Sequence, residues 1–590
     1  MLDKLESLRK LMRDNNIDAY VVPSGDAHAS EYTADYWRTR PWISGFNGSS
    51  GTAVITTEKA GVWTDGRYFI QAEKELKGTG FDLYKEGEPN VPSFTEFLAD
   101  NLPQGGTVGF DGRIVTAENF EKIKTALNKK SVTYFYKEDL IEKIWQDRPA
   151  LPTAPAFEHA PNFAGKSATE KLATVRAKMK EKNITAYLLP ALDDIAWLLN
   201  IRGRDTFGLP VVYSYVLITD TEAHVFIDPT KIPDLYAKLT FQGFTMHGYD
   251  TLPAFLNELK TTQLYYNPTN TNVLLTEAIP QDIQISNNAT QDIVRNLKCI
   301  KTEVEIANIR NAFVKEGVVL VKTIKWLEET IATGKPLIEG DVVRTLQKFR
   351  AEQAHYISDS FSTISAHGAN AAQAHYNSGA EGSSIKPDNF YLLDTGGNYL
   401  DGTTDTSRTF ALCEPTEEMK RDYTLVLKGV IALSRTIFPN KTLGIALDAI
   451  ARQSMWENGL DYKHGTGHGI GYCLSVHEGP QGISSRSTTV GLEAGMLLSN
   501  EPGIYKEGHY GIRTENVILV VENQKTSAGT FLSFETLTHC PIDTRAIDVA
   551  MLTEIERDWL NNYHSRTYET LAPHLNDEEK TWLKTKTATF

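Results

Sequence analysis

The pattern of apolar residues at the start of the chain predicts a helix followed by a strand. Leucine recurs at positions 2, 5, 8 and 11, beside Met12, which indicates one apolar helix face. The run IDAYVVP (Ile17–Pro23) then predicts a strand. The same pattern returns at an offset of 172 − 5 = 167 positions, which indicates an internal duplication, with chance matching of common helix residues as the alternative. Identical residues pair Leu5, Met12, Asn16, Ile17, Ala19, Tyr20 and Pro23 with Leu172, Met179, Asn183, Ile184, Ala186, Tyr187 and Pro190.

Further apolar runs extend this parallel. Strands are expected near Thr52–Thr56 and Gly61–Thr64, and VVYSYVLITDTEAHVFID occupies the corresponding place in the second copy. Later strands near Thr107–Asp111 and Gln263–Asn267 also correspond. Both copies therefore predict mixed α/β domains in which helices cover a sheet.

Composition shifts along the chain predict the domain boundaries. Prolines cluster between residues 147 and 168, which indicates an extended connection. Near residue 300 an apolar stripe opens a long amphipathic helix, and another helix is expected around Asp341–Gln353. We predict an N-terminal α/β domain at 1–150, its duplicate at 168–300, a third domain at 301–550 and a helical C-terminal extension at 551–590 without chemistry of its own. The stripe consists of Ile306, Ile309, Phe313, Val318 and Val321.

Composition excludes several classes of protein. A net charge of −15 without a basic run excludes a nucleic-acid-binding surface. Four scattered cysteines form no C-x-x-C pair, so neither a disulfide framework nor a zinc ribbon is indicated. The N-terminus lacks the apolar core of a signal peptide, and no segment approaches the roughly 20 apolar residues of a membrane span. We expect a cytoplasmic protein.

Four carboxylates and one histidine between residues 391 and 520 carry the candidate chemistry. Asp394 and Asp405 lie in YLLDTGGNYLDGTTDTSRTF, while Glu501 and Glu515 lie in SNEPGIYKEGHYGIRTENVILV. His468 lies between them in HGTGHGIGYCLSVHEGP. Apolar runs and Gly-rich turns in both acidic stretches predict β-hairpins that present one acid from each strand.

Two divalent metal ions would explain this grouping. Four converging carboxylates raise one another's pKa values, and two M²⁺ ions cancel their charge. Hard oxygen ligands with one imidazole suit Mn²⁺, Co²⁺, Fe²⁺ or Zn²⁺, and the sequence does not choose among them.

Strand alternation adds one basic residue to the candidate site. It places Asp405, Ser407 and Thr409 on one face of their strand, and Arg513 on the same face as Glu515. Arg513 is expected either to orient a carboxylate or to contact substrate. The stretch HGTGH lacks the Glu of the H-E-x-x-H zinc motif, and its glycines do not form G-x-G-x-x-G.

These stretches resemble the metallopeptidases with the pita-bread (creatinase/aminopeptidase-like) fold. The order D-x₁₀-D, H, S-x-E-P-G, R-x-E-N matches the family's five ligands. AHY at Ala374–Tyr376, HGTGHGIG at His464–Gly471 and VHEGP at Val476–Pro480 resemble the long three-domain aminopeptidase P (Xaa-Pro aminopeptidase). The resemblance implies a fold of two creatinase-like N-terminal α/β domains followed by a pita-bread catalytic domain.

The resemblance also implies roles for individual residues. Asp394, Asp405, His468, Glu501 and Glu515 would bind two metal ions, expected to be Mn²⁺ before the other three, with a hydroxide bridging the two ions as the nucleophile. Glu501 would shuttle a proton, and His375 and His477 would contact the scissile carbonyl and its tetrahedral intermediate. The proline ring of the substrate would be bound by His464, with Tyr505 and Arg513 nearby.

The function implied is a metal-dependent aminopeptidase, a dinuclear metallohydrolase that releases the N-terminal residue from peptides with proline in second position. The expected partners are such a peptide and a second copy of the chain in a homodimer. Binding to nucleic acid or to a membrane is not expected. A prolidase, which demands an Xaa-Pro dipeptide, shares the ligands and remains an alternative. A non-catalytic peptide-binding pita-bread module is another, but such modules lose ligands, and all five are present here.

Overall fold

The computed structural model describes residues 1–286, 292–379, 381–486 and 490–589. The chain divides into two compact units. The N-terminal unit comprises Met1–His159, Lys166–Phe207 and Val211–Arg295, and the C-terminal unit comprises Ala160–Gly165, Gly208–Pro210 and Asn296–Phe590.

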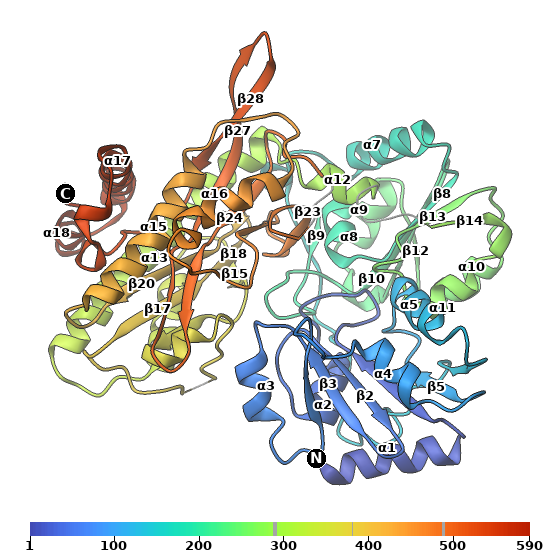
Figure 1. The fold of residues 1–590 in the computed structure, drawn as a ribbon. Coiled ribbons are helices and arrows are strands. Elements are labelled where there is room, and N and C mark those ends of the chain that lie inside the picture. The colour runs from blue at the N-terminus through green and yellow to red at the C-terminus, as the bar shows by residue number, and fades with distance from the viewer. Residues whose placement is uncertain (287–291, 380, 487–489, 590) are drawn as a thin grey trace. The chain divides into compact units, whose positions relative to one another are not determined.

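The first half of the N-terminal unit is one mixed sheet covered by helices (Figure 1). Helix α1 (Leu2–Asp14) buries Leu5, Leu8 and Met12, as the leucine spacing predicts. Strand β1 (Ala19–Pro23) pairs antiparallel with β2 (Thr52–Thr56) and parallel with β5 (Thr107–Phe110). The described strands run in the order β4-β3-β2-β1-β5-β6. The other elements of this half are α2 (Thr39–Ser44), β3 (Ala60–Thr64), α3 (Phe69–Glu75), β4 (Asp82–Lys85), α4 (Phe94–Asn101), α5 (Ala117–Leu127) and β6 (Thr133–Phe135).

The second half repeats this plan. Its described strands run β12-β11-β10-β8-β13-β14, and each neighbouring pair has the same parallel or antiparallel sense as its counterpart. Helix α7 (Ala168–Glu181) precedes β8 (Ala186–Leu189) as α1 precedes β1. The predicted pair of related α/β domains is thus confirmed. The remaining elements are β7 (Phe157–Glu158), α8 (Leu192–Leu199), β9 (Ile201–Arg202), β10 (Ser214–Thr219), β11 (Ala223–Ile227), α9 (Tyr236–Phe241), β12 (Thr245–His247), α10 (Leu252–Asn257), β13 (Leu264–Tyr266), α11 (Val273–Ala278), β14 (Gln284–Ser286) and α12 (Ile293–Lys298).

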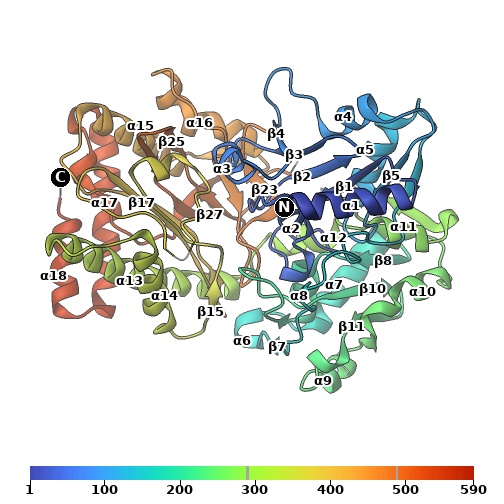
Figure 2. The same cartoon turned by 90° about the horizontal axis from the view of Figure 1, so that it is seen from below.

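The C-terminal unit contains the long helix predicted near residue 300. Helix α13 (Glu303–Ala332) begins at a capping box in which Thr302 and Glu305 satisfy each other's backbone N–H groups. It packs beside α14 (Glu339–Ala351) and buries Val318 and Val321 against α17 (Glu554–Leu571) and α18 (Asp577–Lys586) (Figure 2). The helices α17 and α18 therefore complete the core around α13.

Sheets on the other side of this core carry the acidic stretches. Strands β16 (Ile364–His367), β17 (Phe390–Thr395) and β20 (Thr406–Ala411) form one sheet. Another has the order β21-β28-β27-β24-β22-β23. Its strands are β21 (Phe438–Pro439), β22 (Gly467–Gly469), β23 (Glu478–Ile483), β24 (Leu497–Asn500), β27 (Asn516–Thr526) and β28 (Gly529–Thr536). From α13 onward, the remaining strands and helices of this unit are β15 (Tyr356–Asp359), β18 (Gly397–Tyr399), β19 (Gly402–Thr403), α15 (Glu417–Ser434), α16 (Gly444–Trp456), β25 (Gly503–Lys506) and β26 (Tyr510–Arg513).

Two short segments, Ala160–Gly165 and Gly208–Pro210, belong to the C-terminal unit although they lie far upstream in sequence. Helix α6 (Pro161–Ala164) packs on α13, and the hydroxyl of Tyr472 donates to the backbone carbonyl of Phe163 at 2.9 Å. The side-chain amide of Asn398 donates to the carbonyl of Gly208 at 2.8 Å. The C-terminal unit is therefore discontinuous in sequence.

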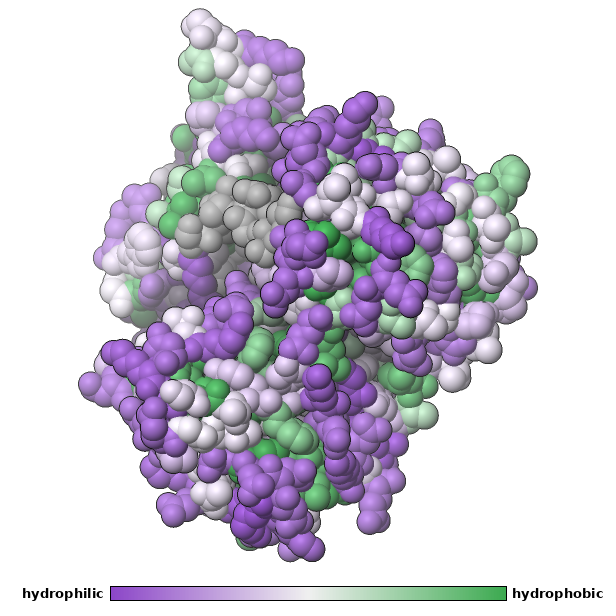
Figure 3. Space-filling model, turned by 90° about the vertical axis from the view of Figure 1, so that its right-hand side faces the viewer, coloured by the Kyte–Doolittle hydropathy of each residue, from purple (hydrophilic) through white to green (hydrophobic). Residues whose placement is uncertain are grey.

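None of the helices in the described ranges combines the length and the apolar content that a bilayer crossing requires. On the face shown in Figure 3, hydrophilic side chains cover most of the surface and apolar groups form small patches.

His564 on α17 predicts acid sensitivity of the C-terminal unit. Its Nε2 accepts a hydrogen bond from the Ile542 backbone N–H at 3.1 Å, and burial together with the charge of Arg408 lowers the pKa of His564 to about 4. The neutral ring therefore contributes stability that is complete above pH 6.5 and is lost as the pH falls towards 4, by about 3 kcal/mol. His564→Gln, which retains an acceptor, is expected to lose correspondingly less stability between pH 7.5 and 4 in urea unfolding of metal-free protein. An equal loss of unfolding free energy in the variant and the wild type over this pH range would contradict this.

Candidate metal centre

Strand pairing brings the four acids of the candidate site to neighbouring strand ends. Asp394 lies in β17, and its register partner Ser407 in β20 lies two residues after Asp405. In the second stretch, Asn500 of β24 pairs with Asn516 of β27, so Glu501 and Glu515 lie just outside the paired strands. The predicted hairpins are therefore corrected in one respect. Of the four acids, only Asp394 lies within a strand, because the chain leaves the paired strands before Asp405, Glu501 and Glu515.

Asp405, His468 and Glu515 form the tightest group. One ligand atom of each lies within 4.8 Å of those of the other two. His468 Nδ1 faces its neighbour's carbonyl (Gly469 O) at 2.9 Å, which leaves Nε2 directed at the carboxylates of Asp405 and Glu501, each 3.4 Å away. A histidine whose second nitrogen is held by a carbonyl has a fixed ring orientation, as metal-binding histidines have.

The electrostatics of the site fit a metal. Asp394 Oδ1 and Glu515 Oε1 are buried oxygens without a hydrogen-bond partner among the described residues. Burial, together with neighbouring carboxylates, raises the pKa values of Asp394 and Glu515, and raises that of Glu501 to about 7. Burial alone would lower the pKa of His468, but its contact with Asp405 and the charge of Glu501 raise it to about 9. Divalent cations would neutralise this uncompensated charge.

Arg513 joins both acidic stretches. Its Nη2 lies 2.5 Å from Asp394 Oδ2, and its Nε donates to the Ser407 hydroxyl at 2.9 Å. Ser407 in turn donates to Glu515 Oε2 at 2.9 Å. Of the two roles expected for Arg513, these contacts support the orientation of carboxylates. Ser407 was not among the predicted site residues, although strand alternation places it on the Asp405 face.

Arg513 also connects the acids to the residues predicted to bind the proline ring. Its Nη1 donates to the Tyr505 hydroxyl at 2.7 Å, and that hydroxyl lies 2.8 Å from His464 Nε2. The backbone of His464 is fixed from α16, because Arg452 donates to its carbonyl at 2.7 Å. His464, Tyr505 and Arg513 therefore form one hydrogen-bonded row that ends at Asp394.

The two remaining histidines lie beside this group. The rings of His477 and His468 meet edge to face, with centroids 4.4 Å apart. His375 is half-buried, and the carbonyl of the preceding residue, Ala374, accepts from Arg513 at 3.3 Å. The structure thus brings all the predicted residues to one region of the C-terminal unit, His375 through its backbone neighbour.

Comparison with known sequences matches the whole chain. The profile of metallopeptidase family M24 matches residues 307–522, and that of its C-terminal region matches residues 530–590. Creatinase/prolidase N-terminal domain profiles match residues 4–143 and 147–305. The chain is 39% identical to "Probable Xaa-Pro aminopeptidase P" of Coprinopsis cinerea, over 99% of this chain and 97% of that protein. It is 38% identical to "Aminopeptidase P2" of Arabidopsis thaliana, over 97% of this chain and 86% of that protein.

Solved structures agree with these matches. X-prolyl aminopeptidase from Caenorhabditis elegans, described as a cytosolic enzyme with a di-nuclear active site, superposes with a TM-score of 0.96 at 34% identity, over 100% of this chain and 99% of that one. Xaa-Pro dipeptidase from Bacillus anthracis superposes at 0.51 and 27% identity, over 64% of this chain and 99% of that one. The predicted fold, two creatinase-like domains before a pita-bread domain, is confirmed. The chain belongs to metallopeptidase family M24.

Proposed function

We propose that this protein is an Xaa-Pro aminopeptidase that uses two divalent metal ions to release the N-terminal residue of peptides with proline in second position. The observation that carries the proposal is the group of Asp405, His468 and Glu515, which Glu501 joins through His468 and Asp394 joins through Arg513. Among the described residues, one buried oxygen each of Asp394 and Glu515 has no hydrogen-bond partner. Full-length similarity to proteins named Xaa-Pro aminopeptidase P supports the substrate class.

Asp394, Asp405, His468, Glu501 and Glu515 are proposed to hold the ions. When bound, the ions would supply a Lewis acid for the scissile carbonyl and lower the pKa of water. Mn²⁺ is proposed because carboxylate oxygens dominate the donor set, although Co²⁺, Fe²⁺ and Zn²⁺ also fit it.

The surrounding side chains are proposed to move the proton and bind the substrate. Glu501, with a metal-free pKa of about 7, would accept a proton and pass it to the departing proline nitrogen. His477 beside His468, and His375, would donate hydrogen bonds where negative charge develops on the carbonyl oxygen. His464 and Tyr505 would contact the proline ring.

A dedicated site suits the bond before proline for a chemical reason. Proline supplies a tertiary amide without an N–H, and its ring restricts the residue before it. A peptidase that binds its substrate through backbone N–H groups therefore handles this bond poorly. A site that contacts the ring itself turns this restriction into specificity.

The test is hydrolysis of an Arg-Pro-Pro tripeptide by chelator-stripped protein with and without added Mn²⁺, beside Asp405→Asn. Release of free arginine only with metal and intact Asp405 is the expected result. Cleavage of the dipeptide Arg-Pro instead would favour the prolidase alternative, since a dipeptidase is among the structural relatives. Inactivity towards both peptides with every metal would favour a peptide-binding module.

We further propose that the protein is a homodimer. Helix α16 leaves Ile445 and Trp456 42% and 50% exposed, and the nearby Ile437 and Leu443 are 51% and 40% exposed. Large exposed apolar side chains on and next to one helix favour a self-complementary contact about a two-fold axis.

Trp456→Glu is expected to convert the dimer to a 65.8 kDa monomer, because a charge buried in an apolar contact is not compensated. Light scattering after gel filtration measures this directly. Phe241→Glu, at a side chain that is 93% exposed on α9, is the matched control and should leave the mass unchanged. A monomeric wild type, or a dimeric Trp456→Glu, would refute the proposed interface.

A cytoplasmic location is also proposed. The four cysteines form no disulfide with one another, which suits a reducing compartment, and the Caenorhabditis elegans relative is described as cytosolic.

A further inference from the structure

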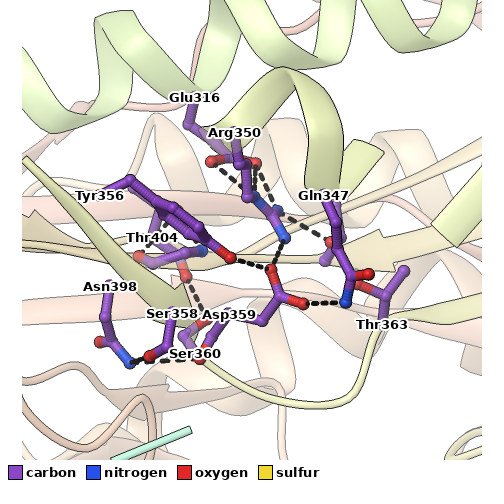
Figure 4. Close-up of polar contacts among 12 residues, drawn as sticks. Glu316, Gln347, Arg350, Tyr356, Ser358, Asp359, Ser360, Thr363, Asn398 and Thr404 are labelled. Carbon is purple, nitrogen blue, oxygen red and sulfur yellow. Dashed lines mark hydrogen bonds and ion pairs between the residues drawn. The ribbon is translucent and has the colours of Figure 1, made fainter. Parts of the chain in front are cut away.

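A buried ion cluster lies next to the segment that carries Asp394 and Asp405 of the candidate metal centre. Arg350 of α14 lies between Glu316 of α13 and Asp359 of β15 (Figure 4). Its Nη2 is 2.5 Å from Glu316 Oε1, and its Nη1 is 2.8 Å from Asp359 Oδ1. The three side chains are only 0%, 1% and 3% exposed. Nothing in the proposed chemistry uses this cluster.

Polar neighbours hold both carboxylates in place. The Tyr356 hydroxyl donates to Asp359 Oδ1 at 2.9 Å, and the side-chain amide of Gln347 donates to Oδ2 at 2.7 Å (Figure 4). The Tyr399 hydroxyl donates to Glu316 Oε2 at 2.8 Å. Removing an arginine and two carboxylates from water costs so much free energy that such clusters contribute little net stability. Their directional hydrogen bonds, however, fix the position of whatever they contact.

The cluster contacts the segment between Asp394 and Asp405, which contains the end of β17 and the strands β18 and β19. Arg350 Nη2 donates to the hydroxyl of Thr395 at 2.8 Å, and Thr395 directly follows Asp394. The hydroxyls of Thr363 and Thr395 are also hydrogen-bonded to each other at 2.7 Å. The cluster therefore holds the end of β17, one residue from a proposed metal ligand.

The residue after Asp359 holds the other end of the same segment. The Ser360 N–H donates to the carbonyl of Gly396 at 3.0 Å, and its hydroxyl donates to the carbonyl of Thr404 at 3.0 Å (Figure 4). Thr404 directly precedes Asp405. A Cβ on Gly396 would lie 1.9 Å from the Thr404 oxygen, so the two ends of the segment are packed against each other without spare room.

We propose that Arg350 is a positioning residue that sets the separation of Asp394 and Asp405, and thereby the affinity of the site for divalent metal ions. It contacts neither metal nor substrate, and acts through Thr395 and through Asp359–Ser360. The inference rests on the proposed metal-dependent function.

The test is Co²⁺ binding by the chelator-stripped full chain, measured by calorimetry and by visible absorption, which reports coordination geometry without any substrate. Arg350→Lys keeps the charge, but an ammonium cannot reproduce the planar fork that reaches Glu316, Asp359 and Thr395. We expect a loss of Co²⁺ affinity of about 10-fold or more and an altered spectrum, as for other residues that orient metal ligands. Arg344→Lys, on the exposed side of the same helix and paired with Asp341, is the matched control and should bind like wild type.

A second variant tests the link itself. Thr395→Val preserves the cluster and the side-chain shape but removes the hydroxyl that accepts from Arg350, so weaker Co²⁺ binding is expected even if Arg350→Lys fails to fold. Wild-type affinity and spectrum in Thr395→Val, with or without a lower melting temperature, would overturn the proposal and leave the cluster a purely structural feature. A wild-type chain that binds no Co²⁺ would instead refute the proposed function, and that arm is measured first.

Discussion

Glu515→Gln is expected to reduce kcat/KM for an Xaa-Pro-Pro tripeptide by at least about 1,000-fold, which corresponds to roughly 4 kcal/mol of transition-state stabilisation. Glu515 is 1% exposed, and its Oε1 has no hydrogen-bond partner among the described residues. The amide of glutamine preserves the shape but carries no charge, so the site loses one of the negative groups that neutralise the metals. Metal analysis should show fewer than two ions per chain.

Glu535→Gln is the control for this variant. Glu535 lies on the adjacent strand β28 and pairs with Arg310 at the surface, where the same change in charge does not reach the site. Its activity and metal content should equal those of wild type. Near-wild-type turnover in Glu515→Gln would contradict the proposed ligand set, whereas equal losses in both variants would show a general effect of charge.

Gly467→Ala is expected to destabilise the C-terminal unit by about 3 kcal/mol, at the upper end of the cost of overpacking, and to abolish metal binding. A Cβ on Gly467 would lie 2.0 Å from the backbone oxygen of Ser499, so β22 and β24 must move apart. His468 follows Gly467 directly, and Glu501 follows β24. The two proposed ligands would therefore separate. Urea unfolding and metal analysis of the purified variant measure both effects.

Gly465 provides a matched control within the same HGTGHG stretch. A Cβ there would meet Cβ and Oγ of Ser484 at 3.3 Å, a contact that a shift of a few tenths of an ångström relieves. Gly465→Ala is expected to retain metal and most of its stability. If Gly467→Ala behaved in the same way, close approach of the two strands would not be what holds His468 beside Glu501.

Local elements of the fold were predictable because hydrophobic periodicity reports burial directly. Leucine spacing predicts α1, and the strands expected at Thr52–Thr56 and Gly61–Thr64 are confirmed to within one residue. Periodicity does not identify a strand's neighbours, so the order of strands in the sheets was not predictable. The domain limits at 150, 168, 300 and 550 stay predictions.

The residues of the candidate site were likewise only partly predictable from the sequence. The four acids and His468 were predictable from their spacing, because carboxylates beside Gly-rich turns are unusual in apolar stretches, whereas His375, His464 and His477 followed only from the resemblance to the family. The residues that orient the acids were not predictable. Arg350 precedes Thr395 by 45 positions, and only the packing of α14 against β17 makes them neighbours. An arginine on a helix carries no signal of such a contact.

The discontinuity of the C-terminal unit limits how the protein can be divided experimentally. A fragment that starts near residue 296 would lack Phe163 and Gly208, whose carbonyls accept from Tyr472 and Asn398. Asn398 also accepts from the Thr403 hydroxyl in the segment between Asp394 and Asp405. Expression of the C-terminal half alone would therefore remove two hydrogen bonds, and the one at Asn398 lies in the segment that joins Asp394 to Asp405. A minimal active fragment has to retain residues 160–210 or replace them with a linker that supplies both acceptors.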